Sequence, residues 1–153
     1  MIRAGELAPD FTLASTLGET VTLSSLRGVP VVLAFYPGDD TEVCTVQLRS
    51  YNDDLSSFES RGAKLLALSP QGMASHLSFA AKYGFRFPLL VDEDKAVGEA
   101  YGILGPLGFY RRAIVVVGAD GVVRWSHRAL TSATFRRTDE LAEVLDGLWA
   151  SGT

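Results

Sequence analysis

VVLAFYPGDDTEVC, residues 31–44, is the stretch that decides the fold of this chain. Its first six residues are continuous, apolar and partly β-branched, as expected for a central strand that is covered on both faces. Pro37 and Gly38 then stop the strand. From Thr41 to about Phe58, apolar residues recur at helical spacing. The stretch therefore predicts a strand, a tight turn and a helix in direct succession.

The rest of the chain alternates between strand-like and helix-like patterns. The predicted strands are residues 11–13, 21–23, 31–36, 64–69, 87–91, 113–117 and 122–126, and the predicted helices are residues 41–58, 73–83, 95–101 and 139–149. Such alternation requires a mostly parallel sheet with helices on both faces, here closed by an antiparallel hairpin at Asp120-Gly121. An α/β protein with a thioredoxin-like fold, a mixed central sheet and an N-terminal β-hairpin has this order.

The composition is that of one globular domain. The chain has 153 residues, of which 47% are hydrophobic and 21% charged, and no repeat or linker divides it, so we expect a single domain over residues 1–153. A formal net charge of -4 argues against nucleic acid as a partner. The apolar runs are far shorter than the roughly 20 residues that span a bilayer, so no membrane association is expected. The N-terminus has no apolar signal region, which predicts a cytoplasmic protein.

The turn that ends at Cys44, the sole cysteine, is the candidate functional site. It lies at the carboxyl end of a buried strand, where ligands bind in open parallel sheets. With Thr41 as the candidate N-cap, Cys44 falls in the first helical turn, where unpaired N–H groups and the helix dipole favour an anion such as a thiolate. The alternative is that Cys44 is a small buried hydrophobic residue, the commoner fate of a lone cysteine. Its position in the sequence does not separate the two.

Pro37, Thr41 and Cys44 resemble the peroxidatic signature of the peroxiredoxins, P-x-x-x-T-x-x-C after an apolar strand. Residues 5–11, GELAPDF, resemble the N-terminal G-x-x-A-P-D-F of that family. Residues 44–47, CTVQ, are similar to the continuation in its bacterioferritin-comigratory (peroxiredoxin Q) branch. The resemblance runs over nearly the whole chain and implies a thiol peroxidase of the thioredoxin-like fold.

The resemblance also implies a role for each matching residue. Cys44 would attack the terminal peroxide oxygen and become a sulfenic acid, and Thr41 would hydrogen-bond the peroxide and the sulfur. Arg112 matches the active-site arginine of the family, which would hold the thiolate and stabilise charge as the O–O bond breaks. Pro37 would pack over the sulfur. Because side chains alternate along a strand, only one of Arg111 and Arg112 can face the site, and the family register favours Arg112.

The chain departs from the peroxiredoxin Q branch at Arg49, where many members carry a second, resolving cysteine. An intramolecular disulfide is impossible with one cysteine. The resemblance shifts to the one-cysteine enzymes of the AhpE type, in which an external thiol reduces the sulfenic acid. That thiol would be a low-molecular-weight thiol, a thioredoxin or a glutaredoxin-like protein. The resemblance implies no cofactor, whether metal, haem or flavin, and family analogy suggests a homodimer.

Two other functions compete with a thiol peroxidase. A thioredoxin-like oxidoreductase for protein disulfides needs the pair C-x-x-C, but Thr41 stands three residues before Cys44. A non-catalytic thioredoxin-fold protein, acting as a binding module or holdase with a vestigial cysteine, is the alternative from another class. The joint presence of Pro37, Thr41 and Arg112 argues against it.

The active-site turn is unusually acidic, with Asp39, Asp40 and Glu42 close to Cys44. Like charges disfavour a thiolate, so these residues would make the thiol less reactive or bias the choice of reductant. The alternative is that they only interact favourably with the positive end of the helix dipole.

Four further features receive structural interpretations. His76 and His127 lack the spacing of metal ligands and are expected at the surface or in hydrogen bonds. Residues 92–94, DED, are interpreted as a solvated turn with one residue capping a helix. Residues 102–108 form a Gly/Pro-rich loop, expected near the site and at a subunit contact. Residues 148–149, LW, are expected on the core-facing side of the last helix.

Overall fold

A five-stranded mixed sheet forms the centre of the molecule. The computed structural model describes residues 1–129 and 134–150, the last two by their backbone alone. The strands lie in the order β5-β4-β3-β6-β7. Their bounds are β3 (Val31–Phe35), β4 (Lys64–Ser69), β5 (Leu89–Val91), β6 (Ala113–Val117) and β7 (Val123–Arg128). β3 pairs in parallel with β4, as β4 does with β5, whereas the β3–β6 and β6–β7 pairs are antiparallel. The sheet is therefore mixed, as predicted, with β6 antiparallel to both of its neighbours.

Five α-helices and a separate hairpin complete the described fold. The helices are α1 (Glu42–Asp53), α2 (Leu55–Glu59), α3 (Met73–Tyr83), α4 (Ala96–Ala100) and α5 (Thr138–Ala150), and the antiparallel hairpin is β1 (Thr12–Ala14) with β2 (Thr20–Thr22). Short 3-10 helices occupy Leu23–Leu26 and Pro106–Gly108. The single helix predicted for residues 41–58 is wrong in one respect: Asp54, with φ −102 and ψ 18, divides it into α1 and α2. The other predicted elements are confirmed to within three residues at each end.

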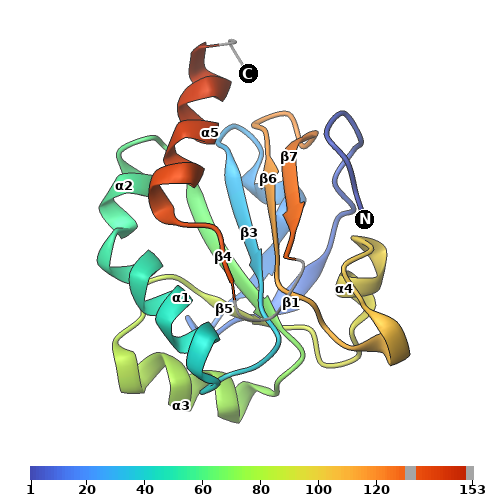
Figure 1. Ribbon diagram of the computed structural model, residues 1–153, viewed down its shortest axis with the longest axis vertical. Coiled ribbons are helices and arrows are strands. Elements are labelled where there is room, and N and C mark those ends of the chain that lie inside the picture. Colours follow the sequence, from blue (N-terminus) through green and yellow to red (C-terminus); the bar gives the residue numbers. More distant parts are fainter. Residues whose placement is uncertain (130–133, 151–153) are drawn as a thin grey trace.

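The sheet separates two apolar clusters, one on each face. Along β3, Val32 and Ala34 contribute to the cluster beneath α1, α2, α3 and α5. Leu33 and Phe35 contribute to the cluster beneath α4 and the N-terminal segment. This alternation follows from the two-residue period of a strand. Figure 1 shows α1 and α5 on one side of the sheet and α4 on the other. The predicted thioredoxin-like α/β fold, with helices on both faces, is confirmed.

The register of β3 and β6 determines what lies beside the active-site turn. Phe35, the last residue of β3, pairs with Ala113, the first residue of β6. Tyr36 and Arg112 are the next residues outward, so they meet at the same end of the sheet. None of the helices in the described part of the chain has the length and apolar character needed to span a bilayer.

Candidate active site

Cys44 lies in the first turn of α1, almost completely enclosed. Its thiol is free and the residue is 1% exposed. The helix begins at Glu42, with Thr41 as the N-cap in an extended conformation (φ −79, ψ 150). Cys44 is therefore the third helical residue, among the N–H groups that have no acceptor within the helix. The end of α1 that carries positive partial charge faces the thiol, as the sequence predicts.

Thr41 takes the predicted position, but its hydroxyl makes a different bond from that of an ordinary cap. No hydrogen bond joins its side chain to the first helical N–H groups. Oγ1 donates instead to the carbonyl oxygen of Gly38, at 3.1 Å, across the tight turn. The backbone carbonyl of Thr41 accepts from both the N–H and the hydroxyl of Thr45, at 2.9 and 2.7 Å. A hydroxyl that donates to a carbonyl keeps its lone pairs as acceptors.

Arg112 is the charged group beside the sulfur. Its Nη2 lies 3.4 Å from Sγ of Cys44, and the residue is 4% exposed. Its Nη1 donates to Oε1 of Gln47. Arg111 points elsewhere, since its Nη2 donates to the carbonyl oxygen of Ala129, at 3.0 Å. Strand alternation thus places Arg112, rather than its neighbour, on the face that carries Cys44.

Gln47 and Tyr51 belong to the same buried hydrogen-bond chain and were not among the predicted site residues. Nε2 of Gln47 donates to the Tyr51 hydroxyl, at 3.1 Å, and that hydroxyl donates to the carbonyl oxygen of Arg136, at 2.5 Å. Burial raises the pKa of Tyr51, which keeps its phenol neutral. Both residues share the inward face of α1 with Cys44, three and seven positions on. A glutamine on an otherwise apolar helix face is the sequence signal that would have pointed to this hydrogen-bond network.

The acidic residues of the turn have different environments. Asp39 is buried and accepts from the Tyr36 hydroxyl at 2.6 Å and from the Ser75 hydroxyl at 2.8 Å, with His76 Nδ1 at 2.6 Å. Burial raises the pKa of Asp39, but the hydrogen bonds from His76, Tyr36 and Ser75 outweigh burial and leave the pKa below its ordinary value. Asp40 is exposed and forms an ion pair with Lys82, at 3.3 Å. It also adopts the left-handed conformation, with φ 57.

The remaining predicted features are placed as follows. His76 is fully buried and hydrogen-bonded, and Nε2 of His127 lies 3.0 Å from Nη2 of Arg136. The interpretation of residues 92–94 as a solvated turn is wrong for Asp92, which is 1% exposed. Its carboxylate accepts from two N–H groups at the start of α4 and from a tyrosine hydroxyl, so the expected capping role is confirmed. Within the described residues, no group of three or more metal-ligating side chains occurs.

The structure tests the expectations for Pro37, residues 148–149 and the loop at residues 102–108 only in part. Pro37 is half-buried after β3, and its role in shielding the sulfur stays a prediction. Leu148 is buried, as expected for the core-facing side of α5, whereas the side chain of Trp149 lies outside the described residues. The loop at residues 102–108 leads toward Arg112 and exposes Leu107 by 93%, but a subunit contact there stays a prediction.

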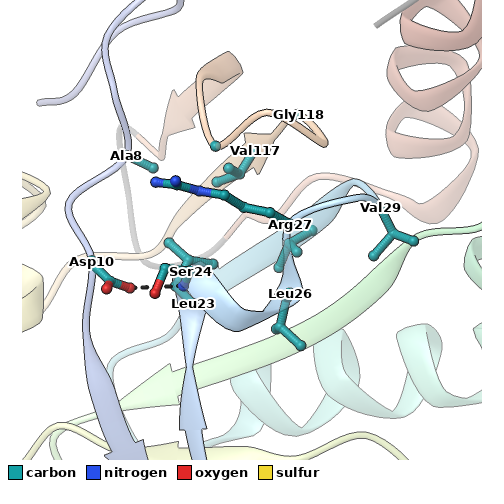
Figure 2. A pocket seen from close by; sticks show the side chains of 11 residues that line it. Ala8, Asp10, Leu23, Ser24, Leu26, Arg27, Val29, Val117 and Gly118 are labelled. Atoms are coloured by element: carbon teal, nitrogen blue, oxygen red, sulfur yellow. Dashed lines mark hydrogen bonds between the residues drawn. The ribbon is translucent and has the colours of Figure 1, made fainter.

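Of the hollows among the described residues, two lie at opposite ends of the central strands. One, of about 260 Å³, adjoins Arg112 and is lined, among the described residues, by Ile114, Phe135, Arg136 and His127 together with smaller side chains. The other, shown in Figure 2, holds about 10 Å³ and lies beside Arg27 at the start of β3. Only the first adjoins a group that touches the sulfur of Cys44.

Known proteins resemble this chain over the residues that include Cys44 and Arg112. The model of the AhpC/TSA family matches residues 4–126. Chloroplastic peroxiredoxin Q of Triticum aestivum is 37% identical over 126 residues, which cover 81% of this chain but only 58% of the wheat protein. The putative peroxiredoxin bcp of Coxiella burnetii is 40% identical over 103 residues, 67% of this chain and 68% of the relative. The solved structure of the Xanthomonas campestris bacterioferritin comigratory protein, studied for alkyl peroxide reduction, has a TM-score of 0.85 at 29% identity and covers 94% of this chain and 98% of its own. The chain belongs to the AhpC/TSA family.

Proposed function

We propose that the protein is a thiol-dependent peroxidase that reduces hydrogen peroxide and organic hydroperoxides with Cys44. The observation that carries this proposal is the approach of the Arg112 guanidinium to within 3.4 Å of the sulfur. Both groups are buried, which strengthens their electrostatic interaction relative to water. A buried hydrophobic cysteine has no need of a cation, so this contact favours the reactive thiolate over the alternative of core filler.

The proposed reaction begins with attack by the Cys44 thiolate on the terminal oxygen of the hydroperoxide. An S–O bond forms and the O–O bond breaks, leaving a sulfenic acid and an alkoxide that takes a proton to become an alcohol, or water from hydrogen peroxide. Arg112 donates to the sulfur before attack and stabilises the negative charge that develops on the leaving oxygen. Oγ1 of Thr41 accepts the hydrogen bond of the peroxide O–H, since its own proton is directed to Gly38.

We propose organic hydroperoxides as substrates because a hollow lies beside Arg112. Ile114 and Phe135 give it an apolar wall next to the guanidinium, and its volume of about 260 Å³ accommodates a small organic group. Alkyl peroxide reduction by the Xanthomonas campestris relative supports the same substrate class.

Regeneration requires a thiol from outside, because the chain has no second cysteine. The first external thiol condenses with the sulfenic acid to a mixed disulfide and releases water; a second thiol then releases Cys44 and forms the external disulfide. Since Cys44 is 1% exposed, the first turn of α1 has to move before a protein thiol can reach the sulfur. The reductant is a low-molecular-weight thiol, a thioredoxin or a glutaredoxin-like protein.

We also propose a cellular location and an oligomeric state for the enzyme. A single free cysteine suits a reducing compartment, which supports a cytoplasmic location. A homodimer is supported by the family and by Leu107 and Phe109, which are 93% and 65% exposed on adjoining parts of one loop. The single-domain organisation over residues 1–153 stays a prediction.

The proposed function is tested by mixing the reduced protein rapidly with hydrogen peroxide and, separately, with cumene hydroperoxide. Tryptophan fluorescence, from Trp125 and Trp149, reports the reaction and mass spectrometry identifies the product. We expect fast second-order formation of a sulfenic acid at Cys44, absent in Cys44→Ser. Oxidation no faster than that of an ordinary free thiol would contradict the proposal and favour the binding module or holdase.

A further inference from the structure

A buried polar cluster lies under the active-site turn and takes no part in the proposed reaction. Its centre is the pair of Asp39 and His76, whose side chains are 1% and 0% exposed and lie 2.6 Å apart. The hydroxyls of Tyr36 and Ser75 both donate to the Asp39 carboxylate, at 2.6 and 2.8 Å. The other ring nitrogen of His76, Nε2, lies 2.9 Å from the carbonyl oxygen of Leu90 in β5. The cluster thus joins the turn to α3 and to the edge of the sheet.

The hydrogen-bond partners fix the number of protons in this pair. A carbonyl oxygen only accepts, so Nε2 of His76 must carry a proton to donate to Leu90. Nδ1 faces a carboxylate oxygen at 2.6 Å, and one proton has to lie between these two atoms. If that proton is on nitrogen, the pair is an imidazolium and a carboxylate; if it is on oxygen, both partners are neutral. In either case the net charge of the pair is zero.

The charge of Asp39 matters because of its place in the chain. Asp39 lies between Pro37 and Thr41, in the turn that leads into the first turn of α1. Burial is the largest cause of the raised pKa of Tyr36. The Asp39 carboxylate and Cys44 raise it further, so the Tyr36 phenol lies within electrostatic reach of both groups. An uncompensated carboxylate at Asp39 would therefore oppose a thiolate in the same low-dielectric interior.

The other charged groups around the thiol do not neutralise the Asp39 carboxylate in place of His76. Arg112 contacts the sulfur from the β6 side, and its Nη1 donates to Gln47. Asp40 and Glu42, the remaining acidic residues of the turn, are exposed, and Asp40 is paired with Lys82. Solvent screens both of these carboxylates, whereas Asp39 has only His76 as a charge partner among the bonds described.

We propose that His76 is a positioning residue of the peroxidase: it neutralises Asp39 and holds the turn against α3, so that the acidic turn does not disfavour the Cys44 thiolate. The inference rests on the proposed peroxidase function of Cys44. It also explains how a chain with three carboxylates around its reactive thiol remains suited to thiolate chemistry.

The test is a double-mutant cycle that separates charge from structure. His76→Asn keeps a donor close to the place of Nδ1 but cannot carry charge, so it leaves Asp39 as a buried uncompensated carboxylate. Asp39→Asn together with His76→Asn removes both charges. Asp39→Asn alone replaces one neutral pair by another. Asp40→Asn, which changes an exposed carboxylate of the same turn, is the matched control.

The readout is the pH dependence of the rate constant with hydrogen peroxide, beside a direct thiolate titration by ultraviolet absorbance. In His76→Asn we expect the midpoint to move up by about one pH unit and the rate near neutrality to fall roughly tenfold, as for a like charge brought close. The double variant should return to within about twofold of the wild type, and Asp39→Asn alone should leave the midpoint within about 0.3 unit. Circular dichroism checks the fold of each variant.

The outcomes distinguish this inference from the proposed function. A wild-type Cys44 that reacts slowly with every peroxide contradicts the function itself. A reactive wild type combined with an unmoved midpoint in His76→Asn overturns the charge role of His76 and leaves the function standing. The same holds if the double variant is as impaired as His76→Asn, because the loss is then structural. If His76→Asn does not fold, an upward shift in Asp39→Asn alone overturns the inference.

Discussion

The two ends of the β3–β6 strand pair carry similar residue types with opposite consequences. At the carboxyl end of β3, Arg112 and Asp39 are buried and bonded to side chains of α1 and α3. At the amino end, roughly 15 Å away at about 3.3 Å per residue, Arg27 and Asp10 are exposed around the small hollow in Figure 2. An arginine or an aspartate influences a reaction strongly only where burial lowers the local dielectric constant and fixed partners hold its charge in place.

The function-bearing end differs from the other in how its charges are satisfied. Its two buried charged groups are each held by another side chain: Arg112 by Gln47, and Asp39 by His76. At the opposite end, the Asp10 carboxylate accepts a backbone N–H from Ser24, and the exposed Arg27 side chain extends toward Ala8, as Figure 2 shows. Substitutions at the carboxyl end of β3 should therefore lower the reactivity of Cys44. Matched substitutions at the amino end should change only the stability of the fold, and by a small amount.

The largest contrast is expected between Arg112→Ala and Arg27→Ala. Loss of Arg112 removes the cation at the sulfur and should lower the rate constant with hydrogen peroxide by roughly 10²- to 10³-fold, the usual cost of removing a group that stabilises transition-state charge. Arg27→Ala should leave the rate within about twofold, because solvent screens so distant an exposed charge. Rapid-mixing kinetics on both variants provides the measurement, and equal losses would contradict the assignment of the active end.

A smaller effect is expected for Gln47→Ala. The substitution removes the acceptor of Arg112 Nη1 and the donor to the Tyr51 hydroxyl, and the loss of these two buried hydrogen bonds should cost about 1–3 kcal/mol of unfolding free energy. The rate should fall roughly tenfold, because Arg112 is no longer held in place beside the sulfur. Urea denaturation and the peroxide rate constant are measured together. A stability loss without any rate loss would make Gln47 a purely structural residue.

Asp40→Asn sharpens the comparison within the turn itself. Because Asp40 is exposed and its partner Lys82 is exposed too, removing its charge should change the midpoint of the pH–rate profile by less than about 0.3 unit. A thiolate titration of Cys44 in wild type and variant gives the answer. A shift as large as that expected for His76→Asn would mean that the whole acidic turn, and not its buried member, controls the thiol.

The smallest effect is expected for Asp10→Asn at the inactive end. The hydrogen bonds to Ser24 lower the pKa of Asp10 below its ordinary 3.8. A carboxyl group with a lowered folded-state pKa stabilises the fold above its unfolded-state pKa and loses that contribution as the pH falls through the folded-state value. Wild type should thus have a slightly higher Tm than the variant at neutral pH, and the difference should vanish as the pH falls through the lowered pKa of Asp10. A difference that persists in acid would mean that the hydrogen bond does not depend on the charge.

Much of the fold could be predicted because its signals are local. The apolar run before Pro37 and the Asp120-Gly121 turn each specify a single element, and the structure confirms both, together with a helix that begins directly after Thr41. The break at Asp54 was missed because the apolar residues continue across it at helical spacing. The direction of β6 was also beyond the sequence: whether a strand runs parallel or antiparallel depends on the strand it joins, here β3.

The sequence by itself determined the strand–turn–helix unit, the place of Cys44 in the first helical turn and the family resemblance, because these depend on residues close together in the chain. The family register favoured Arg112 over Arg111, but only the tertiary structure showed Arg112 beside the sulfur, where the pairing of Phe35 with Ala113 places it. The tertiary structure alone brought Asp39 and His76 together across 37 positions. The physical reason is that burial and charge compensation are properties of neighbours in space, which a linear pattern does not record.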